Sequence, residues 1–104
     1  MIAITGEEQP DEILKLRRTG SARSIGHLLL TKRALGRMLA RCEAGELQSA
    51  ELVEIANQLE ARDEVDYERG AERVIADTLF ELASPEINGE LTPTRCRDLI
   101  RRLS

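Results

Sequence analysis

The segment YERGAERVIADTLFELAS, from Tyr67 to Ser84, contains the clearest periodic pattern of this chain. Its apolar and small residues recur at intervals of three and four positions, which places them on one face of an α-helix. These residues are Tyr67, Ala71, Val74, Ile75, Thr78, Leu79 and Leu82. Asp66 is a favourable N-cap, and Pro85 disfavours helical backbone at the residue before it. We therefore predict a helix over residues 67–84 that buries this face.

Four further segments carry helical signals, at residues 10–20, 21–45, 49–61 and 92–104. Ser21, Ser49 and the Thr92–Pro93 pair are favourable helix starts, and Gly45 is a favourable helix end. Only residues 2–5 alternate as a strand does, and they are too few to form a sheet alone. The sequence predicts an all-α fold, a compact bundle of four to five helices.

The chain of 104 residues has the size of one compact domain, so we expect a single helical domain over 1–104 in which residues 1–9 could be a flexible N-terminus. The longest apolar run, Leu28–Leu30, is too short for a membrane span or a signal peptide. We therefore expect a cytoplasmic protein that does not bind a membrane. Cys42 and Cys96 lie on the apolar faces of predicted helices, which favours reduced core thiols over a disulfide or a metal pair.

The charged residues are unevenly distributed. Residues 43–86 carry 13 acidic and only 3 basic side chains, and no basic residue lies between Arg41 and Arg62. In one interpretation, the basic helix with Arg33, Arg37 and Arg41 lies against the acidic helices and neutralises them. In the other, the acidic middle is a docking surface for a cationic protein.

Phe80 projects almost opposite the apolar face of the helix over 67–84. Either another helix covers it, or it is an exposed apolar anchor for a partner.

Sequence motifs of catalysis are absent. His27 is the single histidine, and there is no Walker loop, G-x-G-x-x-G motif or nucleophile elbow. We therefore expect no catalytic, cofactor-binding or metal-binding residues and no small-molecule substrate. Direct nucleic-acid binding is disfavoured, because Glu51, Glu54 and Glu60 would repel phosphates from the helix over 49–61. A nucleic-acid-associated helical regulator and an adaptor that dimerises through its acidic and basic halves remain as alternatives.

The segment LFELASPEINGELTP, from Leu79 to Pro93, follows acidic helices and precedes a short basic one. With them it resembles small helical bacterial immunity proteins, those that accompany contact-dependent growth inhibition toxins and colicin-type nucleases. The resemblance covers the chain from about Ser49 onward. It departs from the immunity proteins of DNase colicins, because here Ser84-Pro85-Glu86 follows the long helix, so their contact map is not transferable.

The resemblance implies a cytoplasmic antidote that binds the basic C-terminal nuclease domain of a toxin, often a tRNase, and keeps RNA out of its active site. A nuclease binds the phosphates of RNA with Lys and Arg side chains. Carboxylates of an inhibitor can therefore bind to the same side chains. Charge density around the turn between the third and fourth predicted helices, with an aromatic anchor, selects the candidate contact residues. They are Glu60, Asp63, Glu64, Asp66, Tyr67, Glu68, Glu72 and Phe80.

Overall fold

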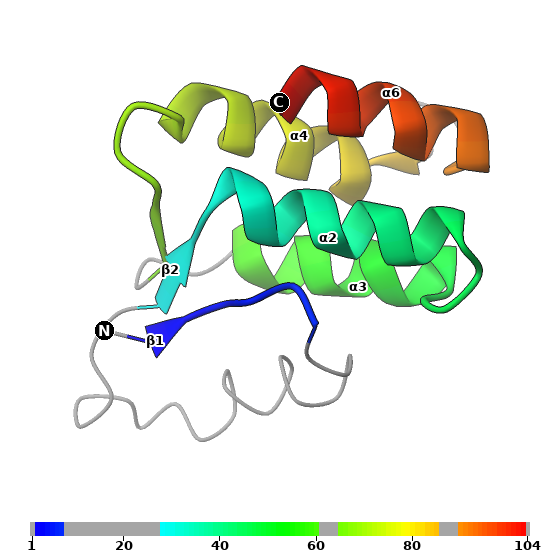
Figure 1. Cartoon of the computed structure of the whole chain (residues 1–104), viewed down its shortest axis with the longest axis horizontal. Helices are drawn as coiled ribbons and strands as arrows, with labels where there is room; N and C mark the ends of the chain where they lie inside the picture. Colours follow the sequence, from blue (N-terminus) through cyan, green and yellow to red (C-terminus); the bar gives the residue numbers. More distant parts are fainter. Residues whose placement is uncertain (1, 8–27, 61–64, 86–89, 104) are drawn as a thin grey trace.

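The computed structural model describes residues 2–7, 28–60, 65–85 and 90–103 of the chain. These residues form four helices and three short strands (Figure 1). The strands are β1 (Ile2–Ala3), β2 (Leu28–Leu30) and β3 (Val65–Tyr67), and the helices are α2 (Lys32–Glu43), α3 (Ser49–Glu60), α4 (Glu72–Ala83) and α6 (Pro93–Leu103). The fold is thus mainly helical, as predicted, with a small sheet that was not predicted.

The helix starts follow local capping chemistry. Thr31 precedes α2, and its Oγ1 accepts a hydrogen bond of 3.0 Å from the Ala34 N–H. Thr92 Oγ1 accepts one of 3.2 Å from the Arg95 N–H at the start of α6. The helices predicted over residues 49–61 and 92–104 are confirmed, as α3 and α6.

The three strands form a parallel sheet in the order β1-β2-β3, with Leu28 opposite both Ile2 and Val65. The prediction of helix at Leu28–Leu30 was wrong. Leu28 and Leu30 are buried, and a continuous apolar run is typical of a parallel strand covered on both faces. Residues 10–20 and 21–27, which were also predicted to be helical, lie outside the described residues.

The helix predicted over 67–84 starts later than expected, at Glu72. Gly70 has φ +88°, which is incompatible with a right-handed helix, and it separates β3 from α4. Asp66 and Tyr67 therefore belong to a strand, and the N-cap of α4 is Ala71. The rest of the pattern is confirmed, because Ile75, Thr78, Leu79 and Leu82 are buried.

The helices alternate in direction, and the strands gather at the end where α2 and α4 begin (Figure 1). The most extensive contacts are between α2 and α6 and between α3 and α4. Both cysteines are free thiols: Cys96 is buried and Cys42 is half-buried.

Two glycines should respond oppositely to alanine. At Gly6, where φ is +89°, a Cβ would lie 2.3 Å from the Ala34 carbonyl O, so Gly6→Ala should lower the free energy of unfolding by about 1 to 3 kcal/mol. Gly36 lies inside α2, and a Cβ at this position would meet open space. Gly36→Ala should therefore raise the free energy of unfolding by about 0.5 to 1 kcal/mol. Urea unfolding measures the stability of both variants. Equal changes in the free energy of unfolding would contradict the close contact at Gly6 and the open space at Gly36.

Candidate functional site

The outer face of α3 is acidic. Leu52, Ile55, Ala56 and Leu59 are buried, while Glu51, Glu54 and Glu60 are exposed. Glu54 accepts a hydrogen bond of 3.2 Å from Gln58 Nε2, and Glu51 accepts one of 3.1 Å from the Gln48 N–H. In the described part of the chain, none of these three carboxylates forms an ion pair with Lys or Arg.

Among the described residues, no ion pair joins the arginines of α2 to the acidic side chains of α3 or α4. Arg33 is exposed, Arg37 pairs with Glu7 at 3.5 Å, and Arg41 Nη1 donates to the Gly6 carbonyl O at 2.9 Å. These last two contacts join α2 to the segment after β1.

Helix α6 instead supplies the counter-charges. Arg95 pairs with Glu81 of α4 at 3.2 Å, and Arg102 pairs with the same carboxylate. Arg97 pairs with Glu43 of α2 at 2.8 Å. Within the described ranges the self-neutralisation is therefore partial, and the acidic face of α3 has no ion pair there.

Three candidate residues gather at one end of the molecule. Because α3 and α4 run in opposite directions, the end of α3, strand β3 and the start of α4 lie at the same end of the molecule (Figure 1). Glu60 and Glu72 are exposed there and Tyr67 is half-buried. The pKa of Tyr67 is raised, mainly by burial and further by the negative charge of Glu60. The structure thus brings Glu60 close to the phenol.

Phe80 lies on the exposed side of α4, with 52% of its surface accessible. It is about 12 Å along the helix from Glu72 and about 80° around it. The interpretation that another helix covers Phe80 is therefore wrong, and the anchor interpretation stays open.

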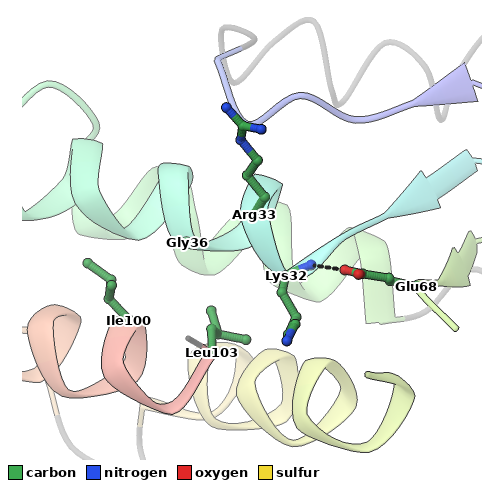
Figure 2. Close-up of a pocket in the computed structure, with 6 residues that line it drawn as sticks. All are labelled: Lys32, Arg33, Gly36, Glu68, Ile100 and Leu103. Atoms are coloured by element: carbon green, nitrogen blue, oxygen red, sulfur yellow. Dashed lines mark hydrogen bonds between the residues drawn. The ribbon is translucent and has the colours of Figure 1, made fainter. Parts of the chain in front are cut away.

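Glu68 has a structural role that the sequence did not indicate. Its Oε1 accepts a hydrogen bond of 2.9 Å from the Lys32 N–H, as Figure 2 shows, and its own N–H donates to the Leu30 carbonyl O at 2.9 Å. The carboxylate therefore caps the positive end of α2. Asp66 is half-buried in β3 and already has an interaction within the chain. Asp63 and Glu64 lie outside the described residues.

Glu68 also borders a pocket of about 340 Å³ between the start of α2 and the end of α6 (Figure 2). Lys32, Arg33, Gly36, Ile100 and Leu103 complete its lining. Sequence reasoning missed this pocket, because no local pattern connects residues 32–36 with residues 100–103.

Because Glu68 caps α2, substitutions of Glu68 should lower stability by different amounts. Glu68→Ala should lower the free energy of unfolding by about 0.5 to 2 kcal/mol, because the Lys32 N–H loses its acceptor. Glu68→Gln keeps an acceptor oxygen and should cost less. Chemical denaturation compares the two variants, and equal losses would show that the hydrogen bond does not stabilise the fold.

Among the described residues, no group of His, Cys, Asp or Glu side chains is arranged to hold a metal ion, and His27 lies outside them. No described helix combines the length and apolar character that crossing a membrane requires. Comparison of the chain with protein-family models, with curated proteins and with solved structures finds no match.

Proposed function

We propose that this chain is an immunity protein that binds a basic nuclease toxin domain and blocks the access of RNA to it. The partner is the C-terminal nuclease domain of a toxin of the contact-dependent growth inhibition or colicin type, a tRNase, and the complex forms in the cytoplasm. The chain acts by binding, catalyses no reaction and needs no cofactor.

The unpaired acidic face of α3 is the observation that supports this proposal most. Glu51, Glu54 and Glu60 are exposed without cationic partners in the described part of the chain, whereas arginines of α6 pair with Glu43 and Glu81. We call Glu51, Glu54 and Glu60, together with Glu72 of α4, the acidic surface. As far as the described residues show, a partner can bind its charge without the loss of an internal ion pair.

A nuclease domain offers the complementary surface. To hold an RNA backbone it must present Lys and Arg in its cleft, and those cations can bind carboxylates as they bind phosphates. Opposite potentials also accelerate encounter and select against other partners. The acidic surface supports this mode because three of its four carboxylates lie on one regular helix, α3, which fixes their spacing.

Phe80 supplies the apolar component of the proposed interface. Large apolar side chains that stay exposed in a monomer are common at the centres of protein interfaces, ringed by polar groups. Among the candidate contact residues that lie in the described ranges, Glu60, Glu72 and Phe80 are exposed, and Tyr67 is half-buried beside Glu60.

Co-purification tests the proposal. The tagged full chain is mixed with the candidate partner, a basic nuclease toxin domain that the proposal expects to be encoded beside it, at low and at moderate salt. We expect stoichiometric capture and a weaker complex at higher salt. Recovery of RNA would instead favour the nucleic-acid-associated regulator, and recovery of a second copy of the chain would favour the adaptor. Either result without the nuclease domain would overturn the antidote proposal.

A further inference from the structure

The pocket between the start of α2 and the end of α6 is lined on one side by a glycine that the fold does not require. Gly36 lies inside a regular helix, where glycine is less favourable than alanine. A Cβ at this position would meet open space, so close packing among the described residues does not explain the glycine. The missing side chain does keep part of the pocket of about 340 Å³ open.

Apolar side chains form the opposite wall of this pocket. Ile100 and Leu103 are three positions apart, so they lie on the same face of α6, about 4.5 Å apart along its axis. Figure 2 shows both side chains on the side of α6 that faces α2. Because the burial of apolar surface is favourable, this wall can bind an aliphatic chain.

A cationic side chain adjoins the apolar wall. Lys32 is four positions before Gly36, so the two residues lie on the same face of α2. In Figure 2 the Lys32 side chain lies on the same side of α2 as Leu103, whereas the Arg33 side chain points away from Leu103 and Ile100. The ammonium group of Lys32 forms no ion pair among the described residues.

The carboxylate that borders the pocket does not pair with this ammonium group. Glu68 Oε1 accepts its hydrogen bond of 2.9 Å from the backbone N–H of Lys32, where the carboxylate faces the positive end of α2. The lining therefore contains two cationic side chains and one carboxylate that already caps a helix. This balance favours an anionic ligand.

We propose that the pocket binds a small monocarboxylate with an unbranched aliphatic chain. Its carboxylate accepts a charge-assisted hydrogen bond from the Lys32 ammonium group, and its chain lies against Ile100 and Leu103 in the space beside Gly36. The pocket volume is near the lower end of the range of about 300 to 1,000 Å³ for ligand sites, which suits a chain of medium length. The ligand is bound and not converted, and the proposal is independent of the antidote function.

Titration of the folded full chain with octanoate, the eight-carbon member of this class, tests the proposal. Two-dimensional NMR follows the amide of Gly36 and the methyl groups of Ile100 and Leu103. We expect saturable shifts of these signals, with a dissociation constant of about 1 mM or below. Unchanged signals, or shifts that spread over the whole chain without saturation, would overturn the proposal.

Two related compounds show which parts of the ligand are recognised. 1-Octanol keeps the chain and lacks the charge, and acetate keeps the carboxylate and lacks the chain. Each should bind at least about tenfold more weakly than octanoate. Equal binding of 1-octanol would show that the carboxylate is not recognised, and equal binding of acetate would show that the apolar wall does not contribute. Either result would contradict the proposal.

Three variants locate the ligand. Gly36→Leu fills the pocket and should abolish binding without a loss of stability, because leucine is a better helix former than glycine. Lys32→Met removes the charge but keeps a long side chain, and it should weaken binding about tenfold or more. Arg33→Met is the matched control, since it removes the same charge from a side chain that points away, and it should retain affinity within about twofold.

Circular dichroism verifies that each variant is folded. Octanoate that binds folded Gly36→Leu as tightly as the unchanged chain does not occupy this pocket. Equal losses of affinity for Lys32→Met and Arg33→Met would mean that only net charge attracts the anion. The proposed site is wrong in both cases.

Discussion

Leu79→Ala should lower the free energy of unfolding by about 2 to 5 kcal/mol. Leu79 is 0% exposed on the inner face of α4, which packs against α3 and α6. Truncation to alanine removes buried apolar surface and leaves a cavity that close-packed neighbours fill only in part. Alanine is at least as good a helix former as leucine, so the loss measures packing. Urea denaturation followed by circular dichroism provides the value.

The adjacent residue is the matched control. Phe80 is 52% exposed, so Phe80→Ala should change stability by less than about 1 kcal/mol while it weakens binding to the nuclease domain. Leu79→Ala should weaken binding only as far as it unfolds the chain. Similar stability losses for both variants would contradict the orientation of α4.

Reversing two charges of the acidic surface should weaken the complex by about 10- to 100-fold. Glu54 and Glu60 are exposed and lack cationic partners in the described part of the chain. Their replacement by Lys would therefore place like charges against the cations of the nuclease cleft. The folded chain should lose little stability, since neither carboxylate caps a helix. Titration calorimetry measures the affinity, and circular dichroism confirms the fold.

A second double variant is the control that distinguishes the effect of where the charges lie from the effect of the net charge. Glu90→Lys combined with Asp98→Lys changes the net charge by the same amount, outside α3 and α4. Both carboxylates are exposed. This control should retain near-normal affinity. If both double variants weaken binding equally, only net charge attracts the partner and the acidic surface is not the interface.

The sequence predicted those helices that are defined by signals within their own residues. The periodic residues of α3 and α6 and the Thr92–Pro93 start were sufficient, because capping and one apolar face define such helices. Leu28–Leu30 was not predictable in this way, since a short apolar run fits a strand and a buried helix equally well. Its pairing with Ile2–Ala3 and with Val65–Tyr67, both distant in sequence, selects the strand.

In the candidate site, too, some features were predictable from nearby residues and others were not. The exposure of Glu60 and Glu72 follows from their positions on amphipathic helices. Their contact with a partner stays a prediction. The role of Glu68 was not predictable, because its acceptor function depends on a backbone N–H 36 positions away. A charge count therefore overestimates the number of carboxylates available to a partner.

Titration of the RNA-cleaving activity of the proposed partner, a nuclease toxin domain that should be encoded beside this chain, with the full chain tests the central claim most directly. We expect cleavage to fall in proportion to added chain and to stop at one chain per nuclease domain, with the Glu54→Lys, Glu60→Lys variant requiring a large excess. Undiminished cleavage in the presence of excess folded chain would contradict the antidote function.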